Sequence, residues 1–120
     1  MTKQKYINLL ISTSEAGGFP AMENNFCKYR CNNGQKCVLG LLIPDQDYTA
    51  EMEGSQLTTL KNKGLFNTNW LPEGVTEDNI CKIQKYHDDI GTSGAIWDNN
   101  KFVLFLNTIF PANQVSVANL

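Results

Sequence analysis

The chain has 120 residues, of which 42% are hydrophobic and 18% are charged, and this composition predicts one domain over residues 1–120 with a single hydrophobic core. Ten basic and twelve acidic residues give a net charge of −2. This balance argues against a general nucleic-acid binder and against a polybasic membrane-surface protein, because both need a strongly basic face.

The sequence predicts a cytoplasmic protein. Its longest uninterrupted apolar stretch covers residues 38–43, far short of the roughly 18 residues that a membrane-spanning helix needs. Lys3 and Lys5 precede an apolar stretch that resembles a signal peptide, but Asn8 interrupts it and no A-x-A cleavage site follows. The four cysteines are expected to stay reduced in that compartment.

The first third of the chain predicts one helix and one hairpin. Apolar pairs four residues apart predict a helix over residues 2–16 that ends at two consecutive glycines. Residues 26–30 alternate in polarity and predict a strand, and the Asn-Asn-Gly sequence at 32–34 is typical of a tight turn. Residues 36–43 then predict a return strand, or a strand that becomes a buried helix near Gly40.

Three more helices are predicted by their capping residues. Ser55 precedes a short amphipathic segment, Thr76 precedes a long one, and Asp98 precedes the apolar helix of residues 99–110. Residues 113–120 are expected to form a short terminal turn. The predicted class is therefore α+β, with about four helices packed around a small β-hairpin in a single compact domain.

Several short motifs follow one another in the middle of the chain. They are C-x-Y-R, G-x-K-C-x-x-G-x-L-I-P-D, E-G and Q-x-x-H-D, which begin at Cys27, Gly34, Glu53 and Gln84. This order of motifs resembles a family of small bacterial and phage proteins over roughly residues 26–89. The family has no established activity, so the resemblance implies important residues and no reaction.

The amino-acid composition suggests that the chain comes from a low-GC bacterium or its phage. The chain contains 14 asparagines and nine lysines but only one arginine, Arg30. Asparagine and lysine codons are rich in A and T, whereas most arginine codons are rich in G and C. The single arginine of such a chain is a candidate for a functional role that requires its planar guanidinium group.

Five side chains predict a pocket for a small anionic ligand. Arg30 would bind a phosphate or carboxylate through two hydrogen bonds, Lys36 would add a positive charge, and Tyr48 would stack on a base. Alternatively, Arg30 pairs with Glu53 or Asp45 and only fixes the loop after the hairpin. The five candidate ligand-binding residues are Tyr29, Arg30, Lys36, Tyr48 and His87.

A cysteine-dependent hydrolase or transferase is the alternative function, with Cys37 as nucleophile and His87 as base. Two features oppose it. Cys37 lies in an apolar run, which raises the pKa of a thiol. Asp88 is the neighbour of His87 on a helix, where adjacent side chains point about 100° apart, so it is not expected to hold the imidazole ring.

No metal or other cofactor is expected. The cysteine spacings are C-x3-C-x5-C, and Cys81 and His87 form C-x5-H, whereas zinc sites usually contain C-x-x-C pairs. Cys27 and Cys37 are instead expected to face each other across the hairpin.

The sequence as a whole predicts a small phage or prophage protein that acts by binding. Its partner would be a nucleotide-like anion that it sequesters or a host protein that it inhibits, and counter-defence is the concrete hypothesis. A homo-oligomer is one possible state of the chain. Neither a nucleic acid nor a membrane is expected as a partner.

Overall fold

The computed structural model describes residues 1–111, and within them it contains four α-helices and one two-stranded antiparallel hairpin. The predicted α+β class is thereby confirmed. In chain order the elements are α1 (Lys3–Glu15), β1 (Met22–Glu23), β2 (Phe26–Cys27), η1 (Ala50–Met52), α2 (Leu57–Asn62), η2 (Thr68–Trp70), α3 (Glu77–Ser93) and α4 (Asn99–Ile109), where η marks a single turn of 3-10 helix.

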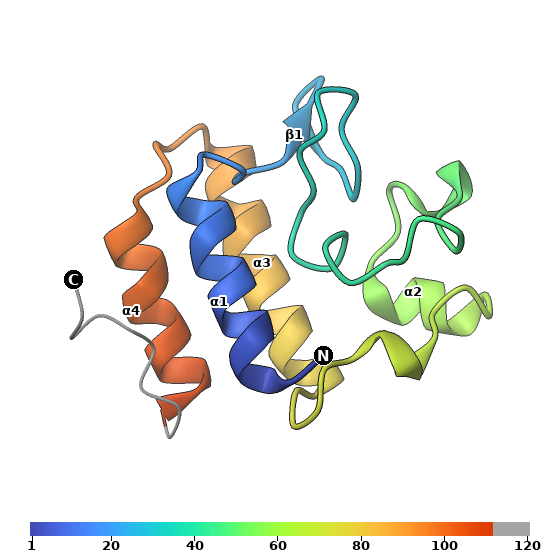
Figure 1. Cartoon of the computed structure of the whole chain (residues 1–120). Coiled ribbons are helices and arrows are strands. Elements are labelled where there is room, and N and C mark those ends of the chain that lie inside the picture. Colours follow the sequence, from blue (N-terminus) through green and yellow to red (C-terminus); the bar gives the residue numbers. More distant parts are fainter. Residues whose placement is uncertain (112–120) are drawn as a thin grey trace.

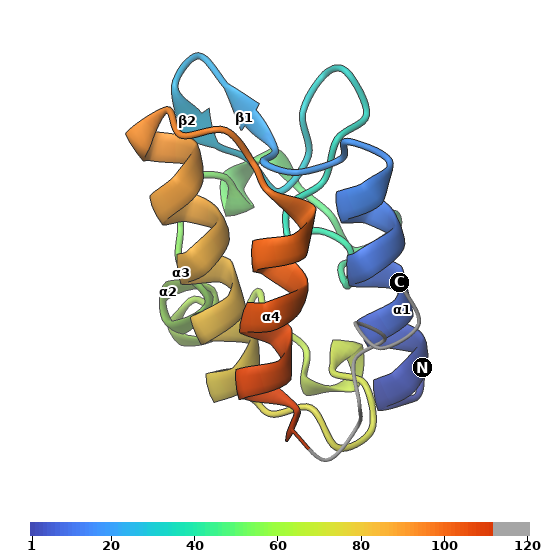
Figure 2. The ribbon, with the colours of Figure 1, turned by 90° about the vertical axis from the view of Figure 1, so that its left-hand side faces the viewer.

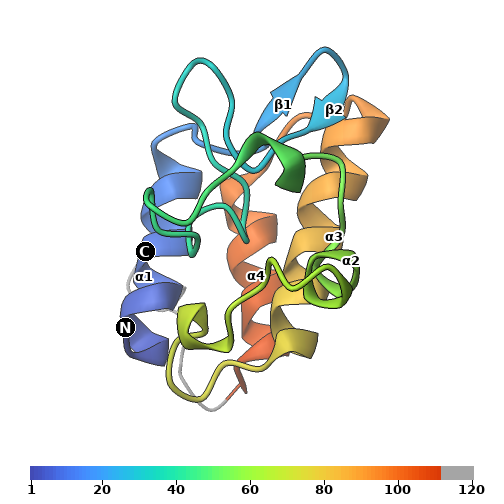
Figure 3. The ribbon, with the colours of Figure 1, turned by 90° about the vertical axis from the view of Figure 1, so that its right-hand side faces the viewer.

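Three helices carry the core. Figures 1 and 2 show α1, α3 and α4 running alongside one another, with the hairpin at one end of this group. Figure 3 shows α2 and the irregular segments on the face away from α4. Tyr6 of α1, Ile83 of α3 and Phe102 of α4 are completely buried. None of the helices within residues 1–111 combines the length and the apolar character that crossing a membrane requires.

Local capping sets the limits of the long helices, and Thr76 and Asp98 are the N-caps that the sequence predicts. Thr76 and Asn79 form a reciprocal capping box at the start of α3, and Gly94 ends this helix in the left-handed conformation, with φ of 74°. The side chain of Asp98 accepts a hydrogen bond from the backbone of Lys101 at the start of α4. These contacts fix where α3 begins and where its side chains face.

The predicted cap of α2 is wrong by one residue. Gln56 occupies the N-cap position and makes no side-chain capping bond. Ser55 precedes it, and its carbonyl oxygen instead accepts a hydrogen bond from the hydroxyl of Tyr29. The terminal turn predicted over residues 113–120 lies outside the described residues.

The hairpin lies earlier in the chain than the sequence predicts. Its turn is formed by Asn24 and Asn25, which both have positive φ, at 54° and 67°, and this is the geometry of a two-residue hairpin turn. Met22 pairs with Cys27 across the two strands. The predicted strand over residues 26–30 is therefore wrong beyond Cys27, and Cys27 does not face Cys37 across the hairpin.

Both predicted forms of residues 36–43, a return strand and a strand that becomes a buried helix near Gly40, are wrong, because neither a strand nor a helix lies in this range. Only a single bridge between Arg30 and Lys36 closes the loop around the Asn-Asn-Gly turn. Residues 37–43 instead form successive turns, in which the N–H groups of Leu41 and Leu42 donate to carbonyl groups three or four residues earlier. Val38 and Leu39 are both buried, and a strand with one solvent-facing side would expose one of two consecutive residues.

The turns bring the backbone of Gly40 directly against that of Tyr29. A Cβ atom added at Gly40 would lie 2.1 Å from the carbonyl oxygen of Tyr29. Because the obstacle is backbone rather than a flexible side chain, it cannot easily move aside. The requirement for glycine here comes from this close approach.

Gly40→Ala should therefore destabilise the protein by about 3 kcal/mol, near the upper end of the usual cost of overpacking. Gly34→Ala is the matched control, because Gly34 has φ of 92° and nothing within 4 Å of its added Cβ. It should cost only about 1 kcal/mol from backbone strain. Urea unfolding of the two variants measures both values, and equal losses would contradict the assignment of Gly40 to a close contact.

Candidate functional site

A cavity of about 580 Å³ lies between α2, α3 and the irregular segments that face them. Its size falls in the range of natural ligand pockets. Apolar side chains and polar groups share its lining, including three of the four cysteines. The lining residues include Cys27, Lys28, Tyr29, Leu39, Glu53, Leu57, Thr58, Ile80, Gln84, Lys85, Asp88 and Asp89.

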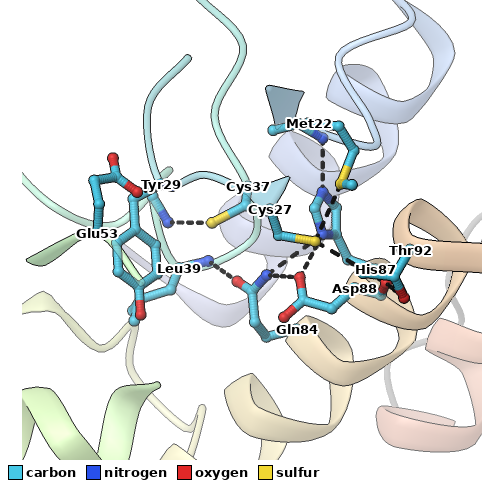
Figure 4. Close-up of polar contacts among 12 residues, drawn as sticks. Met22, Cys27, Tyr29, Cys37, Leu39, Glu53, Gln84, His87, Asp88 and Thr92 are labelled. Atoms are coloured by element: carbon cyan, nitrogen blue, oxygen red, sulfur yellow. Dashed lines mark hydrogen bonds and ion pairs between the residues drawn. The ribbon is translucent and has the colours of Figure 1, made fainter. Parts of the chain in front are cut away.

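Helix α3 supplies one wall of the cavity through residues four positions apart. Ile80, Gln84 and Asp88 all line it, because side chains at this spacing share one face of a helix. The side-chain oxygen of Gln84 accepts a hydrogen bond of 2.9 Å from the backbone N–H of Leu39. Its amide nitrogen donates to Oδ1 of Asp88 at 2.7 Å (Figure 4). Gln84 thus joins the irregular segment to the helix.

His87 is completely buried, and its hydrogen bonds fix its tautomer. Nε2 lies 2.8 Å from the backbone nitrogen of Ala21, and a backbone N–H can only donate, so Nε2 is the acceptor. Nδ1 must then carry the proton of the neutral ring, and it donates to Oδ1 of Asp88 at 2.8 Å. Both ring nitrogens are therefore already occupied.

The structure corrects the expectation that Asp88 is unable to hold the ring of His87. The two Cβ atoms point apart, but rotation of both side chains beyond Cβ brings the carboxylate onto Nδ1. Burial would raise the pKa of Asp88, but hydrogen bonds from His87 and Gln84 outweigh this effect and lower the pKa below its ordinary value. Asp88 is therefore a carboxylate at neutral pH.

The four cysteines are free, and their environments keep them protonated. Burial raises the pKa of Cys27 to about 12, and the neighbouring Asp88 adds to this shift. Burial also raises the pKa of Cys37 strongly and that of Cys31 and Cys81. Nucleophilic cysteines need a lowered pKa. The raised pKa values of these four thiols therefore favour a packing role over a catalytic one.

The candidate pair Cys37 and His87 does not form a nucleophile and its base. Within residues 1–111, the hydrogen-bond partners of the His87 ring nitrogens are Ala21, Asp88 and the amide nitrogen of Gln84, and not Cys37. The Cys37 sulfur accepts instead from the N–H of Gly40, at 3.4 Å. The lone pair that a general base needs is used by Ala21.

Cys27, His87 and Asp88 bring one possible metal ligand each to within 4.8 Å of the others. The His87 tautomer opposes a metal ion there. A metal on Nδ1 would drive the proton to Nε2, where it would face the N–H of Ala21, and two buried donors would then oppose each other. The cluster fits a hydrogen-bonded network better than a metal centre.

The structure brings together three of the five predicted ligand-binding residues. Nη1 of Arg30 lies 2.7 Å from Oδ1 of Asp45, and Nη2 donates to the carbonyl oxygen of Ile43, also at 2.7 Å. The guanidinium carbon lies 4.6 Å from the centre of the Tyr48 ring. Lys36 approaches the same oxygen of Asp45, at 3.9 Å. These contacts fit the alternative interpretation from sequence, in which Arg30 holds the loop after the hairpin.

The other two predicted residues lie elsewhere. Tyr29 lines the cavity, whereas His87 is buried beneath the hairpin segment and does not line it. Glu53 connects the cavity to the group of Arg30, Lys36, Asp45 and Tyr48, here called the Arg30 cluster. Its carboxylate accepts hydrogen bonds from the backbone N–H groups of Tyr29, at 2.9 Å, and Arg30, at 3.1 Å. It also accepts from the Tyr48 hydroxyl, at 2.6 Å. The five residues do not converge on one ligand.

Comparison with protein-family models, with curated proteins and with solved structures finds no match. The resemblance to small bacterial and phage proteins stays a prediction from the motifs alone. The structure nevertheless gives physical roles to several motif residues: Glu53, Gln84 and His87 each accept hydrogen bonds from backbone N–H groups of residues 21–39.

Sequence analysis missed the cavity and most of its lining. Gln84 and Asp88 belong to the Q-x-x-H-D motif, and their spacing of four residues was a visible sign that they share a helix face. The partners of that face, such as Leu39 and Leu57, come from segments far apart in the chain. Nothing local in the sequence indicates that they meet.

Glu53→Gln should destabilise the protein by about 1–3 kcal/mol, because the amide nitrogen cannot accept and a buried N–H of residue 29 or 30 would lose its partner. Glu51→Gln is the control, since Glu51 is exposed two residues away and should change stability by less than about 0.5 kcal/mol. Chemical unfolding compares them, and equal midpoints would show that the Glu53 bonds contribute little.

The free energy of unfolding should fall as the pH rises above about 9. Burial raises the pKa of Cys27 from 9.0 to about 12, so the unfolded chain loses this proton at a lower pH than the folded chain. A group with a raised folded-state pKa stabilises the fold below its unfolded pKa, and the contribution is lost as the pH rises through the folded pKa.

This pH dependence can be measured by urea unfolding at neutral pH and at about pH 11. Cys27→Ala should lose less stability over that interval than the parent protein. The loss should not vanish, because Cys37 also has a raised pKa. A parent protein equally stable at both pH values would contradict the buried, protonated state of these thiols.

Proposed function

We propose that the protein acts by binding a small molecule in the cavity between α2 and α3. The observation that carries the proposal is the cavity itself, with about 580 Å³ of space and a lining that combines apolar walls with fixed polar groups. Tyr29, Gln84 and Asp88 are already held by hydrogen bonds within the protein. A ligand would therefore meet groups that lose little freedom on binding.

Binding is better supported than catalysis. The raised pKa of Cys37 and the occupied lone pair of His87 leave the thiol mechanism without a thiolate and without a base. Sequestration of a ligand needs neither group. We also propose that this is a phage or prophage protein that withholds a molecule from its host and so acts in counter-defence. A cavity that can hold a small molecule supports this hypothesis.

The anion interpretation from sequence loses its main support. The guanidinium group of Arg30 already binds Asp45 and the carbonyl of Ile43, so a phosphate would first have to displace them. Lys36 shares the same Asp45. We therefore place the ligand in the cavity and not at the Arg30 cluster.

A fragment screen followed by amide NMR shifts tests the proposal. Fragments that bind should shift the backbone signals of Leu39, Gln84 and Asp88 together. Thr58→Trp should abolish these shifts, because Thr58 is exposed at the cavity and a large ring there would fill it. Thr59→Trp is the matched control, as Thr59 is the exposed neighbour outside the lining, and it should leave binding unchanged.

Two results would contradict the proposed function. One is a set of fragments whose shifts all fall away from the cavity. The other is binding at the cavity signals that survives Thr58→Trp and Thr59→Trp equally, since the cavity would then not be where the fragments lie.

A further inference from the structure

The charges around the cavity are unevenly balanced. Five charged side chains line it, namely Lys28, Glu53, Lys85, Asp88 and Asp89. Lys85 pairs with Asp89 at 2.7 Å. Lys28 approaches Glu23, which is outside the lining, at 3.8 Å. Both cations are therefore already near carboxylates, and the lining keeps an excess of negative charge.

The two remaining carboxylates differ in what they can still accept. Each oxygen of Glu53 already accepts a backbone N–H, and one also accepts the hydroxyl of Tyr48. Asp88 receives hydrogen bonds from the nitrogen atoms of His87 and Gln84 on Oδ1, and the Cys27 thiol is a further donor to this carboxylate. The Gln84 amide and the Cys27 thiol are neutral, and Nε2 of His87 accepts from Ala21, so these bonds satisfy lone pairs without cancelling the charge.

The second oxygen of Asp88, Oδ2, is therefore the position where a ligand can meet negative charge. Among residues 1–111, the nitrogen donors that reach this carboxylate both end on Oδ1. Figure 4 shows the other oxygen without a dashed contact. The Asp88 side chain is 41% exposed, and the residue lines the cavity. The Asp88 carboxylate is therefore a partly exposed charge in the lining of the cavity.

The walls near this carboxylate are apolar and aromatic. Leu39, Leu57 and Ile80 line the cavity, together with Tyr29. Apolar side chains bind the body of a ligand, and an aromatic ring also attracts a cation through its π face. The cavity thus offers a negative group at one position and apolar contacts around it.

We infer that the cavity binds a small organic cation, with an ammonium or amidinium group on Asp88 and an apolar body against Leu39, Leu57 and Ile80. The inference rests on the proposed function, because it takes the cavity as the ligand site. A phosphate or carboxylate in the same place would face Asp88 with both lining lysines already near other carboxylates. Positive charge is the complementary choice.

Three probes of the same size and different charge test this inference: benzylamine, benzyl alcohol and benzoate. Their affinities are measured at neutral pH by titration of the backbone amide signals of Leu39, Gln84 and Asp88. Benzylamine should bind most tightly and benzoate most weakly. Asp88→Asn should weaken benzylamine about tenfold, as expected for loss of a charged hydrogen-bond partner, and should weaken benzyl alcohol much less because this probe carries no charge.

Asp78→Asn is the matched control. Asp78 lies on the same helix, pairs with Lys82 at 3.1 Å with its side chain 71% exposed, and is absent from the cavity lining. It removes the same charge and should leave the affinity for benzylamine unchanged. If Asp88→Asn does not fold, the order of the three probes on the parent protein decides the question.

The outcomes separate this inference from the proposed function. Benzyl alcohol or benzoate binding at the cavity signals as tightly as benzylamine would overturn the cation inference and keep the cavity as the ligand site. An equal loss of benzylamine affinity in Asp78→Asn and Asp88→Asn would also overturn it, because only bulk charge would then matter. No shift at these signals with any of the three probes would count against both.

Discussion

A buried backbone N–H without an acceptor costs about 1–3 kcal/mol, and this cost governs the middle of the molecule. Residues 28–49 form neither helix nor extended strand, so they cannot satisfy their N–H groups by regular pairing. Several side chains supply acceptors instead, among them Glu53 for residues 29 and 30, Gln84 for Leu39, and His87 for Ala21 in the segment just before. The irregular segment is held in place by these acceptors.

The same acceptors shape the cavity. Gln84 and Glu53 both line it while they hold opposite parts of the irregular segment. Because Gln84 and His87 also donate to Asp88, the carboxylate that we assign to the ligand is positioned by residues that stabilise the fold. Stability and ligand binding are therefore coupled here, and substitutions at Glu53 or Gln84 should alter both.

Burial also decides whether these residues form a reactive thiol site or a structural hydrogen-bond network. Cysteine, histidine and aspartate are the components of a thiol active site, and Cys27, His87 and Asp88 do lie together. However, the His87 ring is turned so that its free lone pair meets Ala21, and burial raises the pKa of Cys27 to about 12. The orientation of one buried ring thus converts a potentially reactive cluster into a structural network.

The sequence by itself determined the helices, because their signals are local. Thr76, Asn79 and Asp98 act within one turn of their own positions, and the apolar spacing of α1 needs no partner to be recognised. The sequence did not place the hairpin correctly. Both Asn24-Asn25 and the Asn-Asn-Gly of residues 32–34 favour turns, and local residue preferences could not show which turn would lie between paired strands.

Only the tertiary structure decided the cavity and the state of its groups. Leu39, Leu57 and Asp88 meet there from three distant parts of the chain. Arg30 had two interpretations in the sequence, and only folding brings its guanidinium group onto Asp45. The tautomer of His87 likewise depends on Ala21, 66 residues away. Periodicity and capping act over a few residues, whereas charge balance and desolvation depend on all the groups that folding brings together.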